Sequence, residues 1–137
     1  MKTNKLGILL GAIFVVALAM YTGATYYDCN GSGALCGETR LTISSSYQTA
    51  DGYHWSGGGV MVQPIYYTSV SGSLSAIDDG QRQFEDSCYD EGPSASASCS
   101  TSVSTDGSHT LVSSSASSSH YVEGWYDTWS GETSDSW

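Results

Sequence analysis

Clustered carboxylates are the first residues whose type and spacing could do chemistry. Six of them fall within residues 78–91 and surround Cys88. Carboxylate oxygens are the ligands that Ca²⁺ prefers, but the spacing does not follow the calcium loop D-x-[DN]-x-[DN]-G. A solvated acidic loop explains the same residues. The candidate calcium ligands are Asp78, Asp79, Glu85, Asp86, Asp90 and Glu91. We keep Ca²⁺ as the only candidate cofactor and assign no metal site.

Aromatic side chains alternate with carboxylates near the C-terminus, over residues 121–129. If this segment is one strand, Tyr121, Glu123, Trp125, Asp127 and Trp129 share a face. Flat rings beside carboxylates suit stacking on sugars, and Tyr and Trp also dominate protein contacts. An ordinary aromatic core or sheet edge is the alternative. The candidate contact residues for a glycan or protein partner at the cell surface are Tyr121, Trp125, Tyr126 and Trp129.

The three histidines, His54, His109 and His120, lie far apart and show no metal-ligand spacing. The chain has no G-x-S-x-G elbow, so a Ser-His-Asp triad has no sequence support beyond the abundance of serine. Phosphate-binding loops and dinucleotide fingerprints are also missing from the sequence. A hydrolase is therefore a minor alternative.

Four cysteines follow the N-terminal apolar run, and an even number in an exported chain indicates two disulfides. Four cysteines allow three pairings, of which Cys29–Cys36 with Cys88–Cys99 is simplest because both loops are short. The spacings lack the tight C-x2-C pairs of zinc sites. Asn30 begins an N-x-S sequon and is a candidate glycosylation site.

The first 24 residues resemble a secretory signal peptide. Lys2 and Lys5 precede an uncharged apolar run from Leu6 to Met20, and small residues allow cleavage after Ala19 or Ala24. An uncleaved anchor spanning residues 6–24 and a pilin-like stalk cut after Gly7 are the alternatives. Membrane contact is expected only through this segment.

Charge excludes nucleic acid as a partner. The whole chain has a net charge of −10, and it becomes two units more negative without Lys2 and Lys5. The only cations beyond the N-terminal segment are Arg40 and Arg82, whereas phosphate neutralisation needs clustered Lys and Arg.

The rest of the chain alternates with the period of two that strands require. The segments 40–47, 65–77 and 94–104 show it best, and Gly72 suggests a bend in the second of them. Asp51-Gly52 and Asp79-Gly80 read as turns. Thr105-Asp106-Gly107 reads as a hairpin turn that returns the chain through residues 109–119 to pair with 94–104.

We therefore predict an all-β fold: a small antiparallel β-sandwich, Ig-like or similar, of six to eight strands, held by disulfides and preceded by an apolar signal or anchor helix. The expected organisation is a signal or anchor over 1–24, a sandwich over 25–129 and a polar tail over 130–137.

The functional expectation is a secreted or cell-surface protein without enzymatic activity, with a structural or binding role in adhesion, envelope or matrix. Self-assembly is the first alternative: a filament subunit joined by strand addition, with Thr25–Tyr27 or the segment after Trp125 as donor. A secreted bacteriocin-like toxin and a small secreted hydrolase are the others.

Overall fold

The structure, a computed structural model, describes residues 20–22, 25–31, 33–58 and 63–137, and this part of the chain is all β. It contains nine strands where six to eight were expected, because two short strands share one edge of β3. The strands are β1 (Met20–Thr22), β2 (Tyr26–Cys29), β3 (Leu35–Ser44), β4 (Thr49–Gly58), β5 (Ile65–Asp78), β6 (Gln83–Gly92), β7 (Ser96–Ser104), β8 (Leu111–Gly124) and β9 (Thr128–Ser136).

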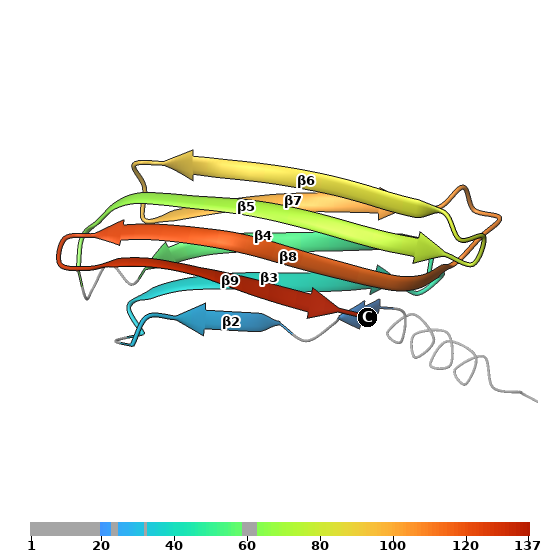
Figure 1. Ribbon diagram of the computed structural model, residues 1–137, viewed down its shortest axis with the longest axis horizontal. Helices are drawn as coiled ribbons and strands as arrows, with labels where there is room; N and C mark the ends of the chain where they lie inside the picture. The colour runs from blue at the N-terminus through green and yellow to red at the C-terminus, as the bar shows by residue number, and fades with distance from the viewer. Residues whose placement is uncertain (1–19, 23–24, 32, 59–62) are drawn as a thin grey trace, which may run out of the picture.

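Two antiparallel sheets lie face to face (Figure 1). The first sheet has the order β1-β3-β4-β7, with β2 also paired to β3, and the second has the order β6-β5-β8-β9. Strands β3 and β4 pack on β8, and β4 and β7 pack on β5. The expectation of an all-β, antiparallel, two-layer architecture is confirmed.

Strict alternation explains why each strand buries one face. In β8 the even positions from Ser114 to Gly124 are buried, and the odd positions from Ser115 to Glu123 are exposed. In β5 the even positions from Thr68 to Asp78 are buried in the same way. A register shift between Ile65 and Tyr67 breaks the alternation at the start of β5 and leaves Tyr66 exposed.

The apolar core is split into two clusters. The larger surrounds Leu41, Ile43 and Leu74, and the smaller surrounds Leu35 and Val122, with Trp129 packed beside them. Between these clusters lies a group of inward polar side chains: Thr39, His54, Ser118, His120 and Thr133 are at most 3% exposed. Burial of polar groups costs free energy unless they are hydrogen-bonded, so this central layer needs an internal hydrogen-bond network.

Both expected disulfides are confirmed. Cys29–Cys36 joins the registered pair of the β2–β3 hairpin. Cys88–Cys99 joins β6 to β7 and therefore links the two sheets along one side of the molecule. The pair of disulfides is consistent with an extracellular environment.

One of the two Asp-Gly turn predictions was wrong. Asp51-Gly52 lies inside β4, opposite Leu41 and Thr42 of β3, and the turn is at residues 45–48 instead. The reason is packing: a Cβ on Gly52 would lie 2.4 Å from Thr101 Oγ1 and 2.9 Å from His54 Nε2, so this glycine makes room for side chains and does not bend the chain. Asp79-Gly80 does form a turn.

The expected hairpin between residues 94–104 and 109–119 was also wrong. Both segments are strands, but β7 pairs with β4 and β8 pairs with β5 and β9, so residues 105–110 cross from one sheet to the other. Gly72 does not bend β5, whose registers are continuous through it. Its missing side chain instead accommodates the ring of His54.

Both ends of the described chain differ from expectation. Met20–Thr22, expected inside the apolar N-terminal segment, is a strand paired with Thr42–Ser44 of β3. The rest of the candidate signal or anchor, 1–19 and 23–24, lies outside the described residues. Residues 130–137, expected as a polar tail, contain most of β9, and Trp137 pairs with Ser114 through both backbone groups. Among the described residues there is no helix with the length and apolarity to cross a membrane.

Candidate functional site

A chain of seven buried polar side chains crosses the centre of the molecule. His54 in β4 approaches Thr101 Oγ1 with Nε2 (3.0 Å) and Ser118 Oγ with Nδ1 (2.6 Å). Ser118 continues the chain to Thr39 Oγ1 at 2.5 Å, and Thr39 continues it to Thr133 Oγ1 at 2.5 Å. These contacts connect strands of both sheets.

The second histidine, His120, connects Thr133 to Ser56, which is the last member of this hydrogen-bonded series. His120 in β8 approaches Thr133 Oγ1 with Nε2 (2.6 Å) and Ser56 Oγ with Nδ1 (2.8 Å). Its ring also stacks on Trp129, with ring centroids 5.8 Å apart. Each histidine faces a glycine of the opposite sheet: a Cβ on Gly37 would lie 2.4 Å from the ring of His120, and one on Gly72 would lie 2.3 Å from that of His54.

One assignment of the hydroxyl and imidazole protons gives every side chain of this network its hydrogen-bond partners. The Thr39 hydroxyl donates to the backbone carbonyl of Thr133 (3.3 Å) and therefore accepts from the hydroxyls of both Ser118 and Thr133. Ser118 then accepts from His54 Nδ1–H, and Thr133 accepts from His120 Nε2–H. The remaining imidazole nitrogens accept from the hydroxyls of Thr101 and Ser56. With two neutral imidazoles, every link has one proton.

Burial keeps both imidazoles neutral. Desolvation lowers the pKa of His54, and it lowers the pKa of His120 to about 4, helped by the neighbouring His54 and opposed by Asp28. Within the described residues, no carboxylate hydrogen-bonds either ring, and Ser118 is itself 3% exposed. All seven members of the network are thus buried between the sheets, and two of them, Ser118 and Thr133, also line a hollow at the surface.

The six candidate calcium ligands are spread over several places. Asp78 is fully buried and receives hydrogen bonds from the backbone and the side chain of Arg82 at 2.9 and 2.8 Å. Burial raises the pKa of Asp78, but these bonds outweigh it and hold the pKa below its usual value. Asp79 accepts from His109 Nδ1 at 2.6 Å and, with Asp78 and His109, forms the one group of described residues close enough to share an ion.

The other four lie along β6, where the alternation separates them. Asp86 and Asp90 point toward the β7 edge and accept the backbone N–H groups of Ser102 (2.8 Å) and Ser98 (2.9 Å). Glu85 and Glu91 point to the outer face, where Glu85 accepts from Gln83. The structure therefore does not bring the six carboxylates together, and Asp86 and Asp90 cap a sheet edge.

The expected aromatic strand over 121–129 was wrong, because a turn at Trp125-Tyr126 separates β8 from β9. Trp129 consequently faces the interior and is 9% exposed, whereas Trp125 and Tyr126 are 59% and 80% exposed. The backbone of this turn is held by bonds from Trp125 N to Pro64 O and from Tyr126 N to Gln63 Oε1, both 2.9 Å.

Exposed aromatic side chains gather around that turn. The ring of Tyr66 lies against that of Trp125, with centroids 5.4 Å apart. We call Tyr66, Trp125 and Tyr126 the aromatic end. Directly behind it, on the outer face of the second sheet, is a group that we call the Tyr–Glu cluster: Tyr67, Tyr89, Glu91, Tyr121 and Glu123. Of these eight residues, the sequence analysis named Glu91, Tyr121, Glu123, Trp125 and Tyr126 and missed Tyr66, Tyr67 and Tyr89.

The Tyr–Glu cluster is built by three neighbouring strands. Strand pairing places Tyr67 opposite Glu123, and Ser69 lies between Glu91 on one side and Tyr121 on the other. The hydroxyls of Tyr67 and Tyr89 both donate to Glu91 Oε2, the second at 2.6 Å. These bonds lower the pKa of Glu91 and raise those of both tyrosines, so the carboxylate stays ionised and the phenols stay protonated.

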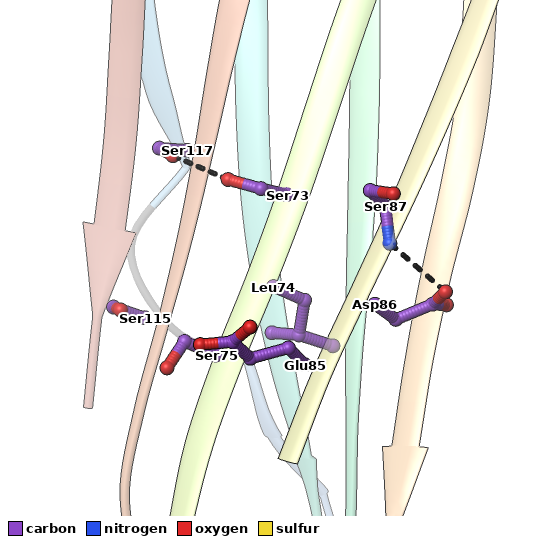
Figure 2. Close-up of a pocket in the computed structure, with 8 residues that line it drawn as sticks. All are labelled: Ser73, Leu74, Ser75, Glu85, Asp86, Ser87, Ser115 and Ser117. Atoms are coloured by element: carbon purple, nitrogen blue, oxygen red, sulfur yellow. Dashed lines mark hydrogen bonds between the residues drawn. The ribbon is translucent and has the colours of Figure 1, made fainter. Parts of the chain in front are cut away.

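A hollow of about 550 Å³ continues the same outer face toward the other end of β5. Serines of β5 and β8 line it, among them the cross-strand pair Ser73–Ser117, whose hydroxyl oxygens lie 2.8 Å apart (Figure 2). Glu85 of β6 lies opposite Ser75 of β5. Small hydroxyl side chains leave this part of the sheet flat. It offers hydrogen-bonding groups but no histidine and no cation.

Asn30, the candidate glycosylation site, has a structural role. Its Oδ1 accepts the backbone N–H groups of Ala34 (3.0 Å) and Leu35 (3.2 Å), and its Nδ2 donates to Asp127 at 2.9 Å. Ser32 of the sequon lies outside the described residues. Cys29 and Cys36, on either side of it, form the disulfide that closes this loop.

No protein-family model, curated protein sequence or solved structure matches this chain.

Proposed function

We propose that this chain is an exported, extracellular binding domain without enzymatic activity, and that the aromatic end is its contact surface. The observation that carries the proposal is the gathering of Tyr66, Trp125 and Tyr126, exposed by 46%, 59% and 80%, on a turn that is fixed by backbone hydrogen bonds. Large exposed aromatic side chains on a rigid frame contribute contact area at low entropic cost.

The frame supports this role. Two disulfides and paired strands hold the turn, and the export signal expected over 1–24 agrees with their oxidised state. Two of the three histidines, His54 and His120, have neutral rings inside the central layer. Chemistry at these groups would require opening the core, whereas binding at the aromatic end requires no rearrangement.

We further infer that the domain is an Ig-like sandwich. In the immunoglobulin fold one sheet contains A, B and E, and the other contains C, F and G, extended by C′. Strands β3, β4 and β7 match the first set, and β6, β5, β8 and β9 match C′, C, F and G. Antibody domains join B to F through a disulfide. Here the hydrogen bond from His54 to Ser118 joins the same two strands.

Strand addition is less favoured as the contact mode. Both expected donors are already paired within this chain: Tyr26 and Tyr27 belong to β2, which pairs with β3, and the segment after Trp125 forms β9 beside β8. The edge of β7 is capped by Asp86 and Asp90. Pairing with a second chain would have to displace these contacts.

The test is binding of the purified full chain to envelope fractions of its host. Trp125→Ala combined with Tyr126→Ala removes the two most exposed rings but keeps the backbone bonds of the turn, and we expect at least tenfold weaker binding. Tyr53→Ala removes an aromatic ring of 37% exposure from another strand, β4, and serves as the matched control. Equal binding by the double variant and the unaltered chain would remove the aromatic end from the function.

A further inference from the structure

The Tyr–Glu cluster has a chemistry that the proposed binding function does not by itself specify. Both tyrosine hydroxyls that point at Glu91 donate to the same oxygen, Oε2. Those two bonds do not use Oε1. The cluster therefore combines an ionised carboxylate, one of whose oxygens is free of these bonds, with two tyrosines, Tyr67 and Tyr89, whose hydroxyl protons are already donated.

The rings are oriented so that their faces remain usable. Tyr67 and Tyr121 meet edge to face, with centroids 6.1 Å apart and planes at 65°. Tyr89 is 60% exposed and Tyr121 is 37% exposed. The face of an aromatic ring carries negative potential, and a cation within about 6 Å of its centroid is attracted to it. Two differently oriented rings beside a carboxylate form a corner that suits a cation.

The charge of the whole face has one sign. The outward positions of β5, β6, β8 and β9 include four glutamates and neither lysine nor arginine; the glutamates are Glu85, Glu91, Glu123 and Glu132. A face of this kind repels anionic ligands and steers cationic ones toward it. Because the hydroxyls of Tyr67 and Tyr89 already donate to Glu91, they have no proton left to donate to a sugar.

We propose that the Tyr–Glu cluster binds a positively charged side chain, arginine or lysine, of a basic protein partner. The cation would lie against the ring faces of the cluster's tyrosines and pair with Glu91 Oε1, with Glu123 as the second carboxylate. This inference rests on the proposed binding function and specifies the partner: the aromatic end supplies apolar contact area, and the cluster selects for charge.

The experiment uses the purified full chain and two fluorescent probe peptides. The first alternates arginine with serine, and the second carries citrulline, a neutral isostere, at each arginine. Anisotropy titration at low salt should give at least tenfold tighter binding of the arginine peptide. Raising the salt to about 0.5 M should abolish most of that difference, because exposed charges are screened over a few ångströms there.

Matched variants locate the site. Glu91→Gln and Tyr89→Ala should each weaken arginine-peptide binding about tenfold. Glu85→Gln removes the same charge from the same face of the same strand, six residues away from Glu91, and should change binding less than twofold. Equal losses for Glu85→Gln and Glu91→Gln would reduce the effect to general charge attraction and overturn the cluster as a site.

Three further outcomes separate this inference from the proposed function. Equal binding of the citrulline and arginine peptides, or inhibition of envelope binding by neutral oligosaccharides but not by the arginine peptide, overturns the cationic partner. The binding function survives either result if envelope binding still depends on Trp125 and Tyr126. A third outcome is that the Trp125→Ala, Tyr126→Ala variant binds the envelope normally while Glu91→Gln still weakens peptide binding. That result overturns the proposed function and supports the cation site.

Discussion

His54 Nδ1 in β4 lies 2.6 Å from Ser118 Oγ in β8, and this hydrogen bond joins the two sheets where most sandwiches place apolar side chains or a disulfide. The pair belongs to a chain of seven buried polar groups that separates two small apolar clusters. A satisfied buried network specifies one arrangement of the sheets, since sliding one sheet over the other would leave several of its members without partners.

The first prediction concerns pH. The pKa of His120 in the folded protein, about 4, is lower than its usual value of 6.5. The unfolded chain therefore binds more protons than the folded one between these values, and stability falls as the pH decreases through this window. His120 alone should account for a loss of about 3 kcal/mol between pH 7.5 and pH 4. Well below pH 4, where His120 is protonated in both states, its contribution is constant.

Urea unfolding at a series of pH values measures this dependence. His120→Gln should flatten the free energy of unfolding between pH 6.5 and 4, although the variant is less stable at neutral pH. His109→Gln alters a partly exposed histidine outside the network and should keep the slope. An unaltered slope in His120→Gln would contradict the assignment.

The second prediction concerns the glycines that face the rings. Adding a Cβ at Gly72 places it 2.3 Å from the His54 ring, and the ring cannot move without breaking its bonds to Thr101 and Ser118. Gly72→Ala should therefore destabilise the fold by about 3 kcal/mol, in the upper range for overpacked cores. Gly92→Ala is the control, since nothing lies within 4 Å of a Cβ there. Thermal unfolding of both variants compares their stabilities. Equal melting temperatures would contradict the claim that the His54 ring needs the space at Gly72.

Alternation in the sequence was sufficient to predict β5, β7 and β8 and the all-β class, because a half-buried strand imposes a period of two on its side chains. The short loops also predicted both disulfides. Asp51-Gly52 was misread because the glycine is required by contacts with His54 and Thr101, which come from tertiary packing and leave no local signal. The partner of β7 was misread for a related reason: a turn motif after a strand does not reveal whether the next strand stays in the same sheet.

The network itself had a signal that sequence reasoning did not use. His120 and Ser118 have the same parity as Ala116 and Val122 in β8, so alternation places both on the buried face. Trp125 and Tyr126 of the aromatic end were named from the sequence, but Tyr66 had no such signal. Tyr66 reaches it only because of the register shift before Tyr67, and Trp129 leaves it because a turn reverses the chain.

The third prediction concerns the sheet edge. The carboxylates of Asp86 and Asp90 accept N–H groups of β7 that would otherwise be available to a strand of another molecule. Asp86→Ala combined with Asp90→Ala should increase self-association at concentrations where the unaltered chain is monodisperse. Glu85→Ala combined with Glu91→Ala removes as much charge from the outer face of the same strand and controls for solubility. Light scattering compares the two, and equal association would assign the effect to charge.

The fourth prediction separates the centre of the hydrogen-bond chain from its end. Thr39 accepts from Ser118 and Thr133 and donates to a carbonyl, whereas Thr101 makes a single bond to His54. Thr39→Val keeps the shape of the side chain but leaves two buried hydroxyl donors without an acceptor; Thr101→Val leaves one imidazole nitrogen without a donor. Each unsatisfied buried group costs about 1–3 kcal/mol.

Thr39→Val should therefore lower the free energy of unfolding about twice as much as Thr101→Val, although both exchanges are equal in size and equally buried. Chemical denaturation at pH 7.5, where both histidines are neutral, measures the two losses on the same scale. Equal losses in the free energy of unfolding would mean that the remaining hydroxyls reorient, so that both variants leave the same number of buried groups unsatisfied. The twofold ratio would show that the protons converge on Thr39, and that this one threonine orients the two histidines from opposite sides.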